Sequence, residues 1–478
     1  MSIDNLLIEL FVEELPPKAL KKLGSAFADD IFGQLRRLDY VASDATFESF
    51  ASPRRLGVLI QNVRDVCLDV PVRKRLVPIN VAFDSAGNPT DALKKRLEKE
   101  DATLADTNRA FEDGKEFIWL ERMALGQPLG HVLEGVIYAA LSNLPIPKLM
   151  SYQLADGCTT VSFVRPAHGL VVLYGADVLP VQVLGLSAGN STHGHRFEAL
   201  VDPVVLKDAD SYAQQLQDEG AVIASFAERR ADIVRQLAAA AAQVGGGCQP
   251  IDDDALLDEV TALVERPKVL VCAFDQEFLD VPQECLILTM KANQKYFPLL
   301  DAAGKLTHQF LVVSNINPQD ASLVIGGNER VVRPRLADAK FFFDQDRKKT
   351  LASRVEGLGK VVYHNKLGSQ GERMARVCAI ARAIGQQLGG DALAEQAAQA
   401  AQLAKTDLVT DMVGEFPELQ GTMGRYYALN DGLAPAVADA IEDHYKPRFA
   451  GDTLPRNDVG VVVALADKLE TLVGMFGI

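Results

Sequence analysis

The most basic segment of the chain covers residues 328–349, and its side chains suit the binding of phosphate groups. It reads N-E-R-V-V-R-P-R-L-A-D-A-K-F-F-F-D-Q-D-R-K-K, with seven basic and four acidic residues, a local +3 in a chain of formal net charge −15. Arginine offers phosphate a planar fork of donors, and lysine offers a point charge. Arg330, Arg333 and Arg335 are therefore candidate phosphate contacts. A solvated helix with its phenylalanines docked in a core explains the pattern equally well.

Smaller basic clusters supply a second group of candidates. The segment from Lys291 to Phe297 interleaves cations with aromatic rings, which is typical of stacking on an unpaired nucleotide and also of a strand end. For each candidate, an intramolecular salt bridge with one of the many carboxylates is an open alternative. The candidates in this second group are Lys291, Lys295, Arg54, Arg55, Arg165, Arg196, Lys446 and Arg448.

Three segments near the end of the chain resemble the HD phosphohydrolase architecture, in which histidine and aspartate side chains hold a metal that activates water. They are A-K-T-D (404–407), H-Y-K-P-R-F-A-G-D (444–452) and L-A-D-K-L (465–469). The corresponding positions are His364, Thr406, Asp407 and Asp467. Because threonine is a poor substitute for imidazole, we expect no metal site here and interpret these positions as degenerate. A metal-dependent phosphohydrolase using His364, Asp407 and Asp467 remains the alternative function.

Several catalytic motifs are missing from the sequence. It contains no G-x-x-x-x-G-K-[ST], no G-x-S-x-G and no H-E-x-x-H. The glycines 245–247 are typical of a helix end, and H-G-H at 193–195 is typical of a polar loop. We therefore expect no catalytic residue on this chain.

The composition describes an ordinary globular protein. The chain has 478 residues, 48% hydrophobic and 24% charged, so it can form two to four domains with large cores. The net charge excludes a uniformly basic nucleic-acid coat but permits a local basic stripe. The six cysteines are scattered without C-x-x-C, and no secretory signal or membrane span is evident. We expect a cytoplasmic location.

Hydrophobic periodicity predicts an α+β protein. Strands are predicted near 5–13, 54–63, 160–164 and 170–174, and hairpins at 109–122 and 295–315. Helices are predicted near 16–38, 90–99, 129–143, 209–243, 252–264, 350–357, 366–388, 392–412, 434–444 and 458–476. Strand signals almost vanish after about residue 346. We therefore predict a mixed α/β body over residues 1–345 and an all-α domain over 346–478.

Together these segments make the sequence resemble the beta subunit of bacterial heterotetrameric glycyl-tRNA synthetase. The likeness runs along essentially the whole chain. The residues that carry it include E-E-L-P-P-K-A-L (13–20), A-S-P-R-R-L (51–56), L-P-I-P-K-L-M (144–150), F-V-R-P-A-H (163–168), G-H-R-F (194–197), T-M-K-A-N-Q-K-Y-F-P (289–298), G-N-E-R-V-V-R-P-R-L-A-D-A-K-F-F-F (327–343), H-Y-K-P-R-F-A-G-D-T-L-P (444–455) and L-A-D-K-L-E-T-L-V-G-M-F-G-I (465–478).

The resemblance implies a function that no residue pattern shows by itself. It implies a tRNA-recognising subunit of an α2β2 glycine–tRNA ligase that uses ATP and magnesium, with the active site on the alpha subunit and no cofactor on this chain. It implies that the N-terminal body includes a B3/B4-like part and that the helical domain is HD-like. It also implies partnership with the alpha subunit and glycine tRNA, no membrane, and a C-terminal anticodon-binding domain that the present sequence lacks.

Overall fold

The computed structural model describes residues 2–84 and 86–478, and the chain separates into two compact units. The first unit contains residues 1–235, 253–268 and 313–317, and the second contains residues 236–252, 269–312 and 318–478. This division into units does not test the predicted domain boundary between residues 1–345 and 346–478, which stays a prediction. Helices and strands are mixed throughout, which confirms the α+β class.

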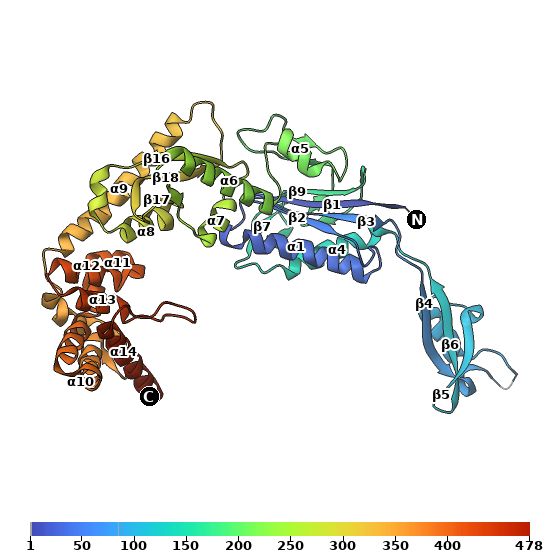
Figure 1. Ribbon diagram of the computed structural model, residues 1–478. Coiled ribbons are helices and arrows are strands. Elements are labelled where there is room, and N and C mark those ends of the chain that lie inside the picture. The colour runs from blue at the N-terminus through green and yellow to red at the C-terminus, as the bar shows by residue number, and fades with distance from the viewer. Residues whose placement is uncertain (1, 85) are drawn as a thin grey trace. The chain divides into compact units, whose positions relative to one another are not determined.

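An antiparallel five-stranded sheet forms the centre of the first unit (Figure 1). Leu6, Ile8 and Leu10 face one side, where they pack with α1 and α4 in one buried cluster. Leu7 faces the other side, where it packs against Tyr212 of α5. The sheet has the order β10-β9-β1-β3-β2, with β1 (Ile3–Val12), β2 (Phe47–Ser52), β3 (Arg55–Arg64), β9 (Ala167–Tyr174) and β10 (Asp177–Val178).

The helices and short strands of the first unit cover this sheet. The apolar residues predicted at helical spacing in 16–38 are buried, and Pro17 begins α1, where a missing N–H costs nothing. The elements are α1 (Pro17–Arg37), α4 (Leu129–Asn143), α5 (Tyr212–Asp218), α6 (Phe226–Val244, which continues into the second unit), α7 (Asp254–Thr261), β7 (Met150–Gln153), β8 (Thr160–Phe163), β11 (Gln182–Val183), β12 (Leu186–Ser187), β13 (Ser191–Thr192) and β14 (Val204–Val205).

Residues 70–124 form a separate three-stranded antiparallel sheet with its own small core. Ile118 of β6 packs against Leu93 and Leu97 of α3, which covers one face of this sheet. Its elements are β4 (Val70–Pro78), α2 (Ile79–Ala82), α3 (Asp91–Lys99), β5 (Thr107–Glu112) and β6 (Lys115–Ala124), in the order β4-β6-β5. The predicted Asp113-Gly114 hairpin is confirmed, and both residues have positive φ.

The second unit combines a four-stranded sheet with a larger set of helices. The strands are β15 (Gln249–Pro250), β16 (Lys268–Ala273), β17 (Phe297–Leu300) and β18 (Leu306–Ser314), in the order β15-β17-β18-β16. The remaining elements are η2 (Gln276–Asp280), α8 (Gln283–Gln294), α9 (Ser322–Asp346), η3 (Ala352–Lys360), β19 (Val362–His364), β20 (Gly368–Ser369), α10 (Gln370–Leu403), η4 (Thr406–Val409), α11 (Asp411–Glu415), η5 (Pro417–Leu419), α12 (Thr422–Asn430), α13 (Pro435–Asp443) and α14 (Asp458–Phe476).

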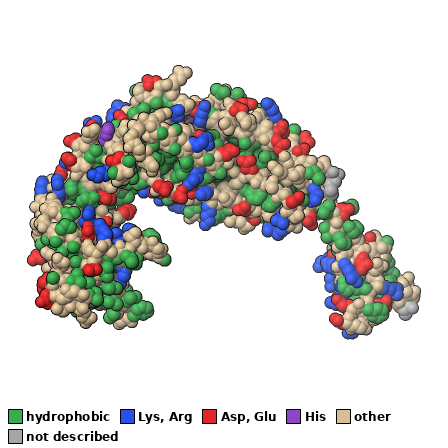
Figure 2. All heavy atoms as spheres, viewed as in Figure 1, with side chains coloured by type: hydrophobic (Ala, Val, Ile, Leu, Met, Phe, Trp, Pro, Cys, Tyr) green, Lys and Arg blue, Asp and Glu red, His purple; other side chains and the backbone are tan. Residues whose placement is uncertain are grey.

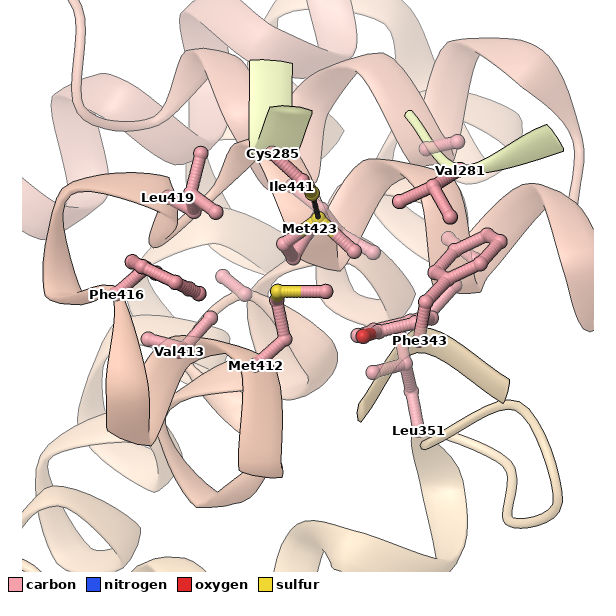
Figure 3. Packing of buried hydrophobic residues seen from close by; sticks show 14 of the residues in the cluster. Val281, Cys285, Phe343, Leu351, Met412, Val413, Phe416, Leu419, Met423 and Ile441 are labelled. Atoms are coloured by element: carbon pink, nitrogen blue, oxygen red, sulfur yellow. Dashed lines mark hydrogen bonds between the residues drawn. The ribbon is translucent and has the colours of Figure 1, made fainter. Parts of the chain in front are cut away.

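One continuous hydrophobic core joins these helices to the sheet of the second unit. Figure 3 shows Cys285 of α8 and Met423 of α12 meeting at its centre, with their sulfur atoms 3.3 Å apart. Phe343 of α9 enters the same core, as predicted for the phenylalanines of the basic segment. Phe341, in contrast, is 58% exposed, so only part of that prediction is confirmed.

Two predicted helical boundaries are wrong. The helix predicted over 209–243 is broken between α5 and α6, where Ala221 has a positive φ of 55° that cannot continue a right-handed helix. The helix predicted over 392–412 ends at Leu403. The predicted break between 388 and 392 does occur, at Gly390, whose φ is 71°. No helix within the described residues is long and apolar enough to cross a membrane.

Candidate functional site

Two of the predicted phosphate contacts, Arg54 and Arg55, lie at the turn between β2 and β3 and form a buried ion-pair network. The Arg54 Nη2 atom is 2.8 Å from one oxygen of Glu265, and Arg55 Nη1 is 3.2 Å from the other. Arg55 Nε also lies 3.4 Å from a carboxylate oxygen of Glu9 on β1. Two guanidinium groups and two carboxylates therefore balance each other inside the first unit.

The network holds its charges in the ionised state. Burial raises the pKa of Glu265, but the charges of Arg55 and Arg54 outweigh it, so the pKa of this carboxyl lies below its ordinary value. Arg55 has 0% exposure and Arg54 has 6%. Of the two alternatives given for Arg54 and Arg55, the structure favours the intramolecular salt bridge, because both guanidinium groups are committed to carboxylates in the interior.

A cavity of about 470 Å³ opens beside this network, within the first unit. We call it the mixed-charge cavity. The carboxylates Glu13, Glu14 and Glu265 and the guanidinium groups of Arg54, Arg165 and Arg196 all line it, together with His195 and Phe197. All of these residues except Glu265 come from E-E-L-P-P, P-R-R, F-V-R-P and G-H-R-F, which lie far apart in the sequence. The fold thus brings four of the segments on which the resemblance rests to one place.

Arg165 and Arg196 remain accessible at this cavity. Arg165 donates to the backbone oxygens of Glu14 and Val164, at 3.0 Å each. Arg196 pairs with Glu13 at 3.1 Å and with Glu14 at 3.2 Å, and about half of its side chain is exposed. Exposed pairs of this kind contribute only about 0–1 kcal/mol, so an incoming anion can compete for Arg196.

The basic residues of α9 point in different directions. Val332, Leu336, Ala339 and Phe343 mark the buried side of this helix. At about 100° per residue, Arg330 points away from that side, whereas Arg333 and Arg335 lie on opposite flanks. Arg333 is 3.1 Å from Asp275, and Arg330 and Arg335 make no ion pair with any described residue.

In the view of Figure 2, acidic and basic side chains are interspersed over the face of the molecule that is shown.

Lys291 and Lys295 lie near the C-terminal end of α8 and are half-buried. The neighbouring Tyr296 and Phe297 are buried, with exposures of 4% and 1%. Tyr296 donates its hydroxyl to Asn328 at 2.8 Å, and burial raises its pKa to about 12. The two rings therefore pack in the core, and of the two alternatives given for this segment the structure favours the strand end, since β17 begins at Phe297.

Lys446 and Arg448 follow α13 in an exposed loop. Lys446 lies 2.8 Å from Asp443, whereas Arg448 pairs with Asp452 at 2.9 Å and is 61% exposed. Phe449, beside Arg448, is 64% exposed. Arg448 is accordingly the more available of the two cations.

The degenerate HD positions are only partly brought together. Asp407 and Asp467 belong to a buried cluster around Lys405, whose Nζ atom is 4.0 Å from Asp467 and 3.6 Å from the centre of the Tyr445 ring. Thr406 is buried nearby and donates to the backbone oxygen of Leu403. His364 is on β19, and no contact with Asp407 or Asp467 is found among the described residues.

The histidine of this cluster is His444 and not His364. Burial, reinforced by Lys405, holds the pKa of His444 well below its usual range, and its Nδ1–H donates to the backbone oxygen of Ile441 at 2.7 Å. Within residues 2–84 and 86–478, no three His, Cys, Asp or Glu side chains are placed to hold a metal ion together. A lysine ammonium thus supplies the positive charge among these aspartates.

Asp407 should give the second unit a distinctive pH dependence. Burial raises its pKa to about 6, although Gly421 and Gly424 donate backbone N–H groups to its Oδ2. Because the pKa of Asp407 is raised in the folded state, the folded protein favours the protonated carboxyl group. The contribution of this group to the free energy of unfolding is therefore fully present below about pH 4 and is lost as the pH rises through 6. In the wild type, the free energy of unfolding should therefore decline between pH 4 and 7. We expect Asp407→Asn to remove up to about 3 kcal/mol of this decline, as measured by urea unfolding at a series of pH values in that range.

The control for this experiment is Asp338→Asn, at an exposed position of α9. It should keep the wild-type decline. An Asp407→Asn protein with the same decline as the wild type would show that Asp407 does not titrate in this range.

Comparison with known proteins gives a consistent result along the chain. The sequence model of the family described as glycyl-tRNA synthetase beta subunit matches residues 6–478. Relatives named glycine–tRNA ligase beta subunit, from Delftia acidovorans, Polaromonas naphthalenivorans and Dechloromonas aromatica, are 69%, 67% and 66% identical. Each comparison covers 100% of this chain and 69% of the relative. None of these three is a phosphohydrolase.

Proposed function

The chain belongs to the family of glycyl-tRNA synthetase beta subunits, and from this membership we propose that it recognises tRNA for an alpha subunit that attaches glycine. The match over residues 6–478 carries the proposal. It is supported by basic side chains that are exposed locally on a chain of net charge −15. Such confined basic sites suit contacts to an RNA backbone, which position the RNA without reading its sequence.

The proposed phosphate contacts are the accessible cations. Arg330 and Arg335 on α9 are exposed and unpaired within the described part of the chain, and Arg333 can exchange Asp275 for a phosphate. Arg196 and Arg448, which are exposed, form the second rank, and Arg165, Lys291, Lys295 and Lys446, which are half-buried, come below them. Arg54 and Arg55 are left out because of their burial.

Glycine activation is proposed to take place on the alpha subunit, with ATP and magnesium bound there. We propose no magnesium site on this chain, and within its described residues no three His, Cys, Asp or Glu side chains are placed to hold a metal ion together. We also propose that the helices α10, α13 and α14, which pack on one another, form an HD-like bundle retained for its shape. A B3/B4-like role for part of the first unit is proposed on the resemblance alone.

Glycylation by purified alpha subunit, with and without this chain, tests the proposed function. Charging of glycine tRNA should rise at least about tenfold when the chain is added, because positioning the RNA converts a diffuse encounter into an ordered one. The full-length Delftia acidovorans relative serves as the positive control.

Two results would contradict the proposal. Formation of glycyl-adenylate by this chain alone would place the chemistry on the wrong subunit. Equal charging with and without the chain, while the Delftia acidovorans relative stimulates, would show that this chain does not support the reaction.

A further inference from the structure

The mixed-charge cavity has features of a binding site that surface cations alone do not provide. Its volume of about 470 Å³ lies within the range of small-molecule sites, roughly 300–1,000 Å³. Three carboxylates and three guanidinium groups line it, so its formal charges cancel. A cavity of this kind suits a ligand that offers both donors and acceptors better than it suits a simple anion.

His195, in the lining of this cavity, carries a buried donor. It is 2% exposed, and its Nδ1 accepts the backbone N–H of Phe197 at 3.2 Å. That hydrogen bond leaves the proton of the neutral ring on Nε2. Among the described residues, Nε2 has no hydrogen-bond partner. A buried donor without a partner is costly, and a ligand oxygen or ring nitrogen would satisfy it.

Phe197 adds an apolar surface beside the same cavity. Its side chain is 82% exposed. Its ring centre lies 6.2 Å from that of His195, with the planes inclined at 60°. An exposed ring next to hydrogen-bonding groups suits a planar ligand that stacks on one face and is read at its edge.

We propose that the mixed-charge cavity binds one unpaired nucleotide of the RNA, through a base that carries an exocyclic amine. The base stacks on Phe197, its amine donates to Glu13 or Glu14, and an acceptor on its edge receives the His195 Nε2–H. The 5′ phosphate pairs with Arg165 or Arg196. Carboxylates accept from the amine of cytosine in this way, and uracil has no such amine. The inference rests on the proposed function, because it assumes that RNA is the partner.

The proposed stacking of a base on Phe197 is tested by measuring the affinity for tRNA with and without this ring. The assembly of this chain with the alpha subunit is titrated with glycine tRNA by filter binding, as wild type and as Phe197→Ala. Because Phe197 is exposed, its replacement should leave the fold intact. The affinity should fall about tenfold, the effect of removing one stacked base. The matched control is Phe111→Ala on β5, where the ring is 76% exposed, and its affinity should equal that of the wild type.

Nucleotide binding by the cavity itself is tested with free probes. Saturation-transfer NMR of this chain with CMP, AMP, GMP and UMP should give signals for the three amine-bearing nucleotides and a much weaker one for UMP. Phe197→Ala should abolish them, and glycine at the same concentration should not compete.

The outcomes separate the inference from the proposed function. Wild-type tRNA binding with no loss in Phe197→Ala would overturn the inference and leave the proposed function standing. Signals from free nucleotides without an effect on tRNA would make the cavity a site for a free nucleotide only, and competition by glycine would make it an amino-acid site. Failure of the wild-type assembly to bind tRNA would overturn both.

Discussion

Replacing Glu265 with alanine is expected to destabilise the first unit by about 3–5 kcal/mol. The carboxylate accepts from Arg54 at 2.8 Å and from Arg55 at 3.2 Å, and all three side chains are buried. Removing it leaves two guanidinium groups in the interior, with Glu9 as the one remaining carboxylate of the network. An uncompensated buried charge costs far more than the net value of the pair that it replaces.

Urea unfolding followed by tryptophan fluorescence provides the measurement. Trp119, the only tryptophan in the sequence, lies on β6 in the separate three-stranded sheet, so circular dichroism is recorded as well, to follow the loss of the five-stranded sheet that carries the network. The matched control is Glu112→Ala, which removes the carboxylate partner of the exposed Arg75 and should cost at most about 1 kcal/mol. If Glu265→Ala were as stable as Glu112→Ala, the network would not hold the first unit together.

The same network shows why sequence patterns misplaced Arg54 and Arg55. Two adjacent arginines at the start of a predicted strand have the appearance of a surface cluster. Their partner Glu265 follows 211 positions after Arg54, so the pairing depends on tertiary structure that no local pattern contains. The sequence did indicate that these two arginines matter, because A-S-P-R-R-L is one of the segments that carry the family resemblance. The resemblance does not show, however, whether their side chains are buried or exposed.

Local structure was predicted better than long-range contacts. The helix over 129–143 and the hairpin at Asp113-Gly114 were predicted correctly, because amphipathic spacing and a turn with positive φ are properties of neighbouring residues. The strands β4 and β16 and the helix α8 were not predicted. In α8, apolar residues alternate irregularly with polar ones, since it packs against both the sheet and α9 within one core.

In the candidate site too, individual residues were predicted better than the contacts between them. Arg165 and Arg196 were predicted as separate cations, but their meeting with Glu13, His195 and Phe197 at one cavity depends on the fold. His195 was interpreted as part of a polar loop, whereas it is buried. The HD-like cluster shows a similar shift, because the histidine at Asp407 is His444 and the positive charge comes from Lys405.

Reversing two charges on α9 should have the largest effect on RNA binding. In the assembly with the alpha subunit, Arg330→Glu combined with Arg335→Glu is expected to weaken tRNA binding by about 10- to 100-fold and to lower the slope of log affinity against log salt by about 1.5–2. Both side chains are exposed and make no ion pair within the described residues, so the fold should persist. The matched control reverses Lys95 and Arg96 on α3, which changes the net charge equally.

The comparison with Arg333→Glu then identifies the face of α9 that meets RNA. Arg330 and Arg333, three residues apart, lie close together on the surface of the helix, whereas Arg335 lies on the flank opposite Arg333. If Arg333→Glu alone matched the double variant, the RNA would lie on the Asp275 side, where Arg333 now pairs at 3.1 Å. An unchanged salt slope in the double variant, with its fold intact, would show that neither Arg330 nor Arg335 neutralises a phosphate of the RNA.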